Sequence, residues 1–186
     1  YYNKCTRRGL VGPFTAVADA VGIPIMVYNV PARTSVNMSP DVFAEIAEHR
    51  NIAAIKEASG NISPIAEMAR PPRGKAGLYS GNDDHVGPLL SLGGLGVISV
   101  VANIAPRYTH DMVMAYLSGD TAKACDMQLR LNPLVGALFC ETSPIPVKTA
   151  LRLMGYDMGR FRLPLTEMED ASLGRLKKEM HEFGLI

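Results

Sequence analysis

The sequence predicts an α/β fold with a parallel sheet, followed by a helical region at the C-terminal end of the chain. Three observations predict it: four short apolar runs have strand character, helical patterns separate them, and only helical patterns follow the fourth run. Because crossovers between such strands are right-handed, the strands should be parallel. An αβ barrel and a doubly wound sheet both fit this pattern.

The predicted strands are nearly all apolar instead of alternating between apolar and polar residues. They cover 23–30, 52–57, 76–81 and 96–101. Neighbouring residues of a strand point to opposite faces, so runs of this kind are typical of parallel strands that are covered on both faces. We therefore expect a buried sheet.

Helices connect the predicted strands. The first, over 10–21, precedes strand 23–30, and the second begins with Ser39 as N-cap and Pro40 at the first helical position. A third begins near Asn61 or Ser63.

The helical region after the fourth strand should contain four helices. Their apolar spacing places them at 106–117, 120–138, 144–154 and 167–183. Thr166 and Glu169 form a predicted capping box at the start of the last one.

Length and composition exclude several classes of protein. The 186 residues allow one sizeable core, and 47% hydrophobic and 20% charged residues are typical of a soluble globular protein. A net charge of +1 without a basic stripe argues against a nucleic-acid partner. The longest apolar run, 93–106, is shorter than the roughly 20 residues of a membrane span. No membrane segment or export signal is expected.

Cysteine usage points to a reducing compartment. Cys5, Cys125 and Cys140 are far apart in the sequence and form no C-x-x-C pair, so neither a zinc knuckle nor a disulfide framework is expected. We expect a cytoplasmic location. The chain does not begin with methionine and its first residues read like the interior of a protein, from which we expect a truncated chain.

Lys56 is the first candidate for a catalytic residue, because it ends an apolar strand. Working residues of parallel α/β folds lie at the C-terminal ends of strands, where Tyr28 also lies. If the strands are aligned by their ends, the two side chains should share a face, about 4.8 Å apart. Burial favours a neutral amine, which attacks ketones to form a Schiff base while a nearby phenol transfers protons.

Simpler interpretations remain open for both residues. Lys56 can extend to solvent or pair with Glu57, and Tyr28 can be an ordinary core tyrosine. Arg33, in the loop after Tyr28, is placed to bind a carboxylate with two hydrogen bonds or to stay solvated. The ligand-rich stretch 80–85 is better explained by a helix cap than by a metal site.

Several motifs together resemble the dihydrodipicolinate synthase family. They are YYNK at 1–4, YNVPART at 28–34, IKEASG at 55–60, GVISV at 96–100 and PIPVK at 144–148. The resemblance runs the length of the chain. It implies the C-terminal half of a (β/α)8 TIM barrel, from the end of strand four to strand eight within 1–118, followed by a C-terminal helical region, 119–186.

The resemblance also implies roles for individual residues. Lys56 would be the Schiff-base lysine that captures pyruvate, Tyr28 the proton-relay phenol, and Arg33 the group that binds the carboxylate of aspartate semialdehyde. Tyr2 would reach across a dimer interface into the neighbouring relay. Gly81 and Ile98 would line the pocket through their backbone. No metal or organic cofactor is implied.

The family pattern is incomplete in this chain. A Gly-Thr-Thr loop that holds the pyruvate carboxylate is absent, and only Tyr1 matches the lysine-feedback site. Half a barrel exposes sheet edges and an apolar inner face, so we expect a homo-oligomer or a second chain that supplies the missing half.

The implied activity is a carbon–oxygen lyase that condenses pyruvate with L-aspartate 4-semialdehyde to 4-hydroxy-tetrahydrodipicolinate in the biosynthesis of diaminopimelate and lysine. The alternatives are a related pyruvate aldolase and a non-catalytic half-barrel that acts as an assembly or regulatory partner.

Overall fold

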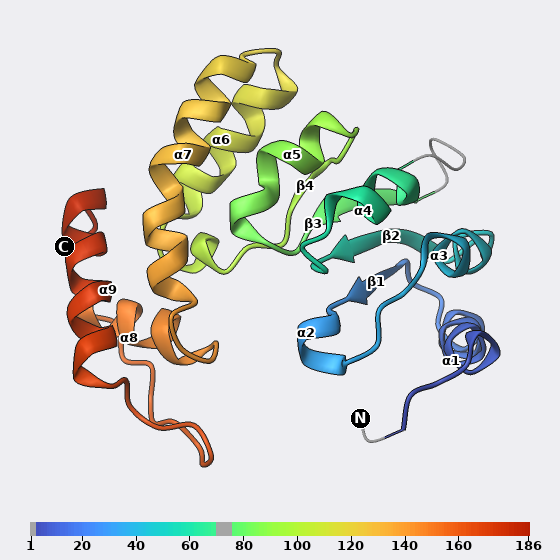
Figure 1. The fold of residues 1–186 in the computed structure, drawn as a ribbon, viewed down its shortest axis with the longest axis horizontal. Coiled ribbons are helices and arrows are strands. Elements are labelled where there is room, and N and C mark those ends of the chain that lie inside the picture. Colours follow the sequence, from blue (N-terminus) through green and yellow to red (C-terminus); the bar gives the residue numbers. More distant parts are fainter. Residues whose placement is uncertain (1–2, 70–75) are drawn as a thin grey trace. The chain divides into compact units, whose positions relative to one another are not determined.

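A computed structural model describes residues 3–69 and 76–186 (Figure 1). The chain divides into two compact units, the first ending at Ile98 and the second covering Ser99–Ile186. The boundary expected between residues 118 and 119 falls in the turn after helix α6 (Pro106–Leu117) and stays a prediction.

The first unit contains a four-stranded parallel sheet in the order β1-β2-β3-β4. The strands are β1 (Ile25–Asn29), β2 (Ile52–Glu57), β3 (Gly77–Ser80) and β4 (Gly96–Val97). The connecting helices are α1 (Arg7–Ala20), α2 (Pro31–Thr34), α3 (Pro40–Ile46), α4 (Ile62–Met68), η1 (Asp83–His85) and α5 (Val86–Ser91). The predicted parallel α/β architecture is confirmed.

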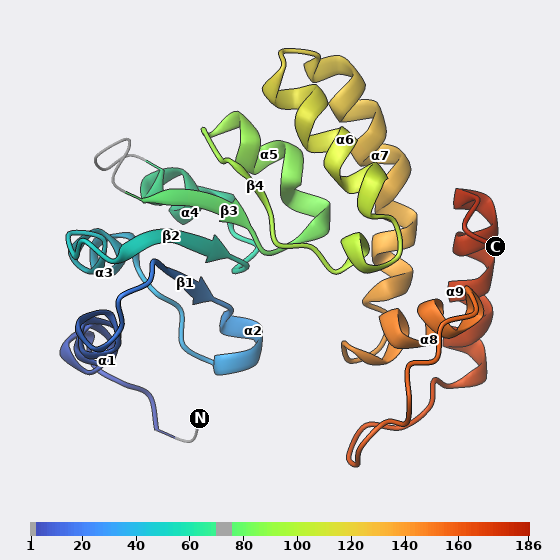
Figure 2. The same cartoon turned by 180° about the vertical axis from the view of Figure 1, so that it is seen from behind.

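Within the first unit, the helices of the described residues cover one face of this sheet. Val27, Ile55 and Leu78 are buried in a core to which α1, α3, α4 and α5 contribute (Figure 2). On the opposite face, Met26 is 38% and Tyr28 46% exposed. The expectation of a sheet buried on both faces is therefore wrong for the described residues: both faces are apolar, but the connecting helices pack on one.

The pairing of β1 with β2 contains one irregularity. The partner of Ile25 is Ile52, whereas the partner of Met26 is Ala54, so Ala53 is an extra residue. Ile52 consequently joins the helix-covered core. Simple alternation predicts instead that Ile52 shares a face with Lys56, and that prediction is wrong. Because the shift lies at the start of the strands, pairing is regular from Met26 to Asn29.

The second unit is helical. It contains η2 (Val101–Asn103), α6, α7 (Thr121–Leu138), α8 (Ile145–Leu153) and α9 (Asp170–Phe183). Helix α7 packs against α6 and α9, and its core positions include Leu131, Leu134 and Leu138. The four predicted helices are confirmed, with small differences at their ends.

Two of the predicted boundaries that differ from the structure have a clear physical reason. The fourth strand ends at Val97, and the rest of the apolar run turns into η2, where the Ala102 amide donates to Ser99 Oγ (2.8 Å). Helix α9 begins at Asp170, and no capping box forms. The Glu169 amide donates to Glu141 Oε1 instead (3.0 Å).

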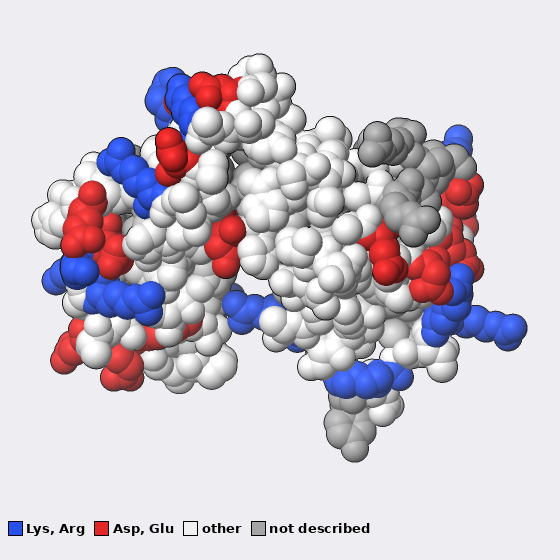
Figure 3. All heavy atoms as spheres, turned by 45° about the horizontal axis from the view of Figure 1, so that its top comes forward, with Lys and Arg blue, Asp and Glu red and all other residues white. Residues whose placement is uncertain are grey.

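Charged side chains of both signs are interspersed on the face that Figure 3 shows, in keeping with a net charge of +1. Among the described residues, no helix is long and apolar enough to cross a membrane.

Candidate active site

Tyr28 and Lys56 lie side by side at the C-terminal ends of β1 and β2. They are direct partners in the parallel pairing, and Lys56 Nζ lies 4.1 Å from the centre of the Tyr28 ring. The predicted adjacency of the two side chains is confirmed. The ammonium or amine group faces the ring, a geometry typical of cation–π contacts. Lys56 is partly buried and Tyr28 half exposed, so the described residues do not enclose the pair.

Glu57 points away from Lys56, to the helix-covered face, and is 1% exposed. Its Oε2 accepts a hydrogen bond from Asn29 Nδ2 (2.8 Å), and its Oε1 accepts one from the Ser59 amide (2.6 Å). An ion pair between Lys56 and Glu57 is therefore not formed. Strand alternation separates the two charges.

Asn29, the partner of Glu57 across the strands, is also buried. Its Nδ2 donates a second bond to Asn37 Oδ1 (2.9 Å), and its Oδ1 accepts one from the Met38 amide (3.0 Å). Both hydrogens and the oxygen of the Asn29 amide thus have partners. The residue ties the end of β1 to the end of the loop that follows it.

Arg33 lies on α2, inside that loop, and its side chain is exposed. The loop is shaped by Pro31 at the first helical turn and by Ser35, which has a positive φ of 56° and donates its amide to the Pro31 carbonyl (2.8 Å). Within the described parts of the chain, the Arg33 guanidinium has no hydrogen bond or ion pair. It stays available to a ligand at the same end of the sheet as Lys56.

Gly81 follows β3 and touches the Lys56 side chain. A Cβ at this position would lie 3.2 Å from Lys56 Cε and 2.6 Å from Ala58 Cβ. The Gly81 amide also donates to the Glu57 carbonyl (2.7 Å). Only a glycine lets the backbone pass this close to Ala58, beside the lysine.

Ile98, after β4, lies at the same end of the sheet. Its amide donates to the Ser80 carbonyl (2.8 Å), and the residue is 41% exposed. Tyr1 and Tyr2 lie outside the described residues, so the structure does not place them.

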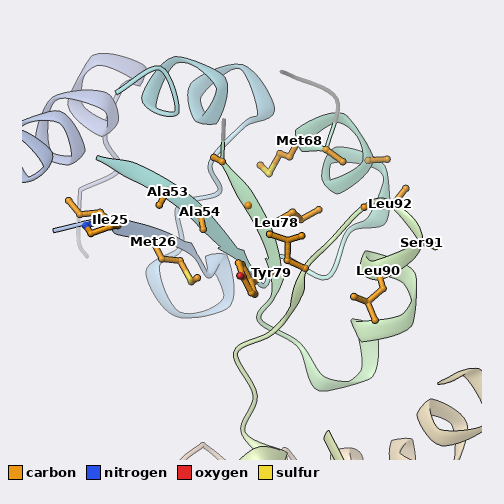
Figure 4. A pocket seen from close by; sticks show the side chains of 17 residues that line it. Ile25, Met26, Ala53, Ala54, Met68, Leu78, Tyr79, Leu90, Ser91 and Leu92 are labelled. Carbon is orange, nitrogen blue, oxygen red and sulfur yellow. The ribbon is translucent and has the colours of Figure 1, made fainter. Parts of the chain in front are cut away.

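A large cavity among the described residues lies elsewhere in the first unit. Its volume is about 1180 Å³, and its walls come from the other end of the sheet, at Met26, Ala54 and Gly77, and from α5 (Figure 4). Tyr79 lines it, with its ring against Gly77, although Tyr79 is the β3 partner of Lys56. Apolar side chains dominate these walls, and neither Lys56 nor Tyr28 contributes to them.

Sequence reasoning missed the side-chain hydrogen bond between Asn29 and Glu57. A signal was present: both are polar residues one position after the Tyr28–Lys56 pair, which alternation places on the covered face. Buried polar groups in such positions need partners, and each supplies the other's.

Comparisons with known proteins agree on one family. The model of the dihydrodipicolinate synthetase family matches residues 1–182. Proteins named 4-hydroxy-tetrahydrodipicolinate synthase from Thermoanaerobacter sp. (strain X514) and Lachnoclostridium phytofermentans are 56% and 52% identical over the whole chain. The chain spans 63% and 64% of their lengths.

Solved structures give the same result. Dihydrodipicolinate synthase from Thermotoga maritima is 40% identical, with a TM-score of 0.96, and the whole chain matches 64% of it. A chloride-inhibited synthase from Acinetobacter baumannii, complexed with pyruvate, is 39% identical, with a TM-score of 0.95 over the whole chain and 64% of that protein. The four-stranded sheet of the first unit therefore has the architecture of part of a TIM barrel.

Proposed function

Since the chain belongs to the dihydrodipicolinate synthetase family, we propose that it carries the Schiff-base centre of a 4-hydroxy-tetrahydrodipicolinate synthase, a lyase of lysine and diaminopimelate biosynthesis. The observation that supports this most directly is the placement of Lys56 Nζ 4.1 Å from the Tyr28 ring centre. An amine and a phenol side by side at the carboxyl end of parallel strands suit imine chemistry with proton transfer.

The proposed reaction begins at Lys56. The neutral amine attacks the ketone carbon of pyruvate, and loss of water leaves an iminium that links this carbon to the Lys56 nitrogen. Tyr28 accepts and returns protons during this dehydration. Loss of a methyl proton gives an enamine, whose carbon bonds to the aldehyde carbon of L-aspartate 4-semialdehyde. Attack by the amino group of that second substrate closes the ring and displaces Lys56 as the free amine.

The surrounding residues bind the substrates in this proposal. Arg33 holds the carboxylate of aspartate semialdehyde with its planar guanidinium. Gly81 and Ile98 line the pyruvate end of the pocket, which the contact of Gly81 with Lys56 supports. Tyr2 joins the proton relay of a neighbouring copy. The chemistry requires no metal or organic cofactor.

The proposal includes assembly in the cytoplasm. The uncovered face of the sheet carries Met26, Tyr28 and, beyond β3, Leu95, all more than a third exposed. Burial of such a face stabilises an assembly by about 25 cal/mol per Å² of apolar area. We propose a homo-oligomer, and the alternative is a separate chain that completes the barrel. Sedimentation of the pure protein distinguishes the two, because only the homo-oligomer assembles from one kind of chain.

Reductive trapping tests the function. The protein is incubated with pyruvate, reduced with borohydride and weighed as an intact chain. We expect one added reduced pyruvate in the wild type and none in Lys56→Ala, with Lys123→Ala, on the exposed side of α7, as the matched control that still reacts. An unmodified wild type, under conditions that label a full-length synthase, would instead support the non-catalytic assembly role.

A further inference from the structure

Residues 30–38 follow β1 and contain Arg33; we call this segment the Arg33 loop. The side chain of the residue before it, Asn29, closes the loop. Asn29 ends β1, and its Oδ1 accepts the amide of Met38, nine positions later, while Nδ2 reaches Asn37 Oδ1. The exposed segment between them, including α2 and Arg33, is thus anchored at both ends by one amide group. Within the described parts of the chain, the Arg33 side chain contributes no hydrogen bond that would hold the loop.

Asn29 can make these bonds only in one orientation, and Glu57 fixes it. The carboxylate accepts from Nδ2 at 2.8 Å, so the Asn29 oxygen must face Met38. Glu57 is held in turn by the Ser59 amide at 2.6 Å. Because a carboxylate accepts at both oxygens, it satisfies both donors; a glutamine would turn its own NH₂ toward one of them.

The same two residues continue the Tyr28–Lys56 pair. Asn29 and Glu57 are partners in the sheet, one position beyond that pair and on the opposite face. Backbone bonds extend the connection: the Ala58 amide donates to the Asn29 carbonyl (2.9 Å), and the Gly81 amide donates to the Glu57 carbonyl (2.7 Å). The reacting face and the loop therefore share one buried anchor.

We propose that Glu57 and Asn29 are positioning residues that hold the Arg33 loop beside Lys56 for the second substrate. The role of Arg33 rests on the proposed function, whereas the anchoring of the loop does not. Glu57 and Asn29 act through the loop and do not touch the substrates. Loosening the anchor should weaken the binding of aspartate semialdehyde more than the reaction with pyruvate, since the backbone pairing of β2 still holds Lys56.

Exchanging the carboxylate of Glu57 and the amide of Asn29 tests the anchor. In Glu57→Gln and in Asn29→Asp, a buried group loses its partner, so amide hydrogen exchange across residues 30–38 should rise about tenfold or more. In the double variant, the new glutamine can donate to the new aspartate and still accept from Ser59, while the exposed Asn37 can turn its NH₂ toward the aspartate. Exchange should then return to within about threefold of the wild type. Glu67→Gln, an exposed substitution on α4, is the matched control that leaves exchange unchanged.

A milder variant covers the case in which a single substitution prevents folding. Asn37→Ala changes an exposed residue and removes one of the three bonds of Asn29. It should speed exchange at residues 35–38 without lowering the unfolding midpoint. Unchanged exchange in Asn37→Ala and in the folded single variants, or a double variant no better protected than the single ones, would overturn the proposed anchor.

Kinetics separate positioning from stability alone. Glu57→Gln should raise KM for aspartate semialdehyde about tenfold while kcat changes less, and pyruvate trapping at Lys56 should stay within about threefold. An unchanged KM together with faster exchange would overturn the positioning role. Failure of the wild type to trap pyruvate would refute the proposed function, yet the exchange comparison would still decide whether Glu57 and Asn29 anchor the loop.

Discussion

Lys56 Nζ lies over the ring of Tyr28, 4.1 Å from its centre, because the two residues are direct partners at the ends of neighbouring parallel strands. Side chains of sheet partners point to the same face, and strands are about 4.8 Å apart. The contact is thus a product of the backbone register. It places an amine and a phenol together without any contribution from loop conformation.

Removal of the Tyr28 hydroxyl tests the phenol as a proton carrier. Tyr28→Phe keeps the ring that contacts Lys56, so the amine should stay in place. If the hydroxyl transfers protons, the rate of pyruvate trapping should fall about 10²- to 10⁴-fold. Rapid-quench reduction with borohydride measures that rate. A Tyr28→Phe variant as fast as the wild type would remove the phenol from the mechanism.

Much of the strand framework could be predicted from the sequence. The bounds of β2 match the prediction at both ends because a short apolar run there ends in Lys56 and Glu57. The fourth strand could not be predicted this way, since its apolar run continues past Val97 into η2. Hydrophobicity alone does not separate a buried strand from a buried helical turn.

The candidate site could also be predicted only in part from the sequence. Alignment of strand ends was enough to predict that Tyr28 and Lys56 are neighbours. A pair of Lys56 with Glu57, left open because the two are adjacent in sequence, does not form, since alternation directs their side chains to opposite faces. The position of Arg33 depends on tertiary hydrogen bonds of Asn29 that no local pattern reveals.

Substitution of Gly81 should disturb Lys56 directly. In Gly81→Ala, the new methyl group would overlap Ala58 Cβ and press on Lys56 Cε. We expect a loss of about 1–3 kcal/mol in the free energy of unfolding and slower pyruvate trapping by the folded fraction. Chemical denaturation measures the free energy of unfolding, and pyruvate trapping without denaturant measures the second effect. Gly12→Ala, where a methyl group meets no atom within 4 Å, is the control.

Arg33→Ala separates the two substrates. Because its side chain is exposed, the substitution should change the free energy of unfolding by less than about 0.5 kcal/mol. Pyruvate trapping should be unaffected, while KM for aspartate semialdehyde should rise about tenfold or more from the lost charged contact. Steady-state kinetics with each substrate varied in turn checks this. An unchanged KM for the aldehyde would exclude Arg33 from its binding.

The link between α1 and α3 should make stability depend on pH. Arg7 pairs with Asp41 and Glu45, and a hydrogen bond from Ser39, followed by the charge of Arg7, lowers the pKa of Asp41 below its usual 3.8. A lowered pKa in the folded state stabilises above pH 3.8 and ceases to do so as the pH falls through the folded-state pKa. Asp41→Asn should therefore lower the unfolding midpoint at neutral pH.

The difference between Asp41→Asn and the wild type should shrink steadily below pH 3.8. Thermal unfolding at a series of pH values measures it. A difference that does not change with pH would show that the ion pair contributes nothing through the charge of Asp41.

In the proposed function, Lys56 is the amine that condenses with pyruvate. The most direct measurement is peptide mapping by mass spectrometry after reduction of the protein with borohydride in the presence of ¹³C-labelled pyruvate. We expect one labelled peptide, with the adduct on Lys56, and no label in Lys56→Arg, which keeps the charge but cannot form the imine. Label spread over exposed lysines, or retained in Lys56→Arg, would contradict it.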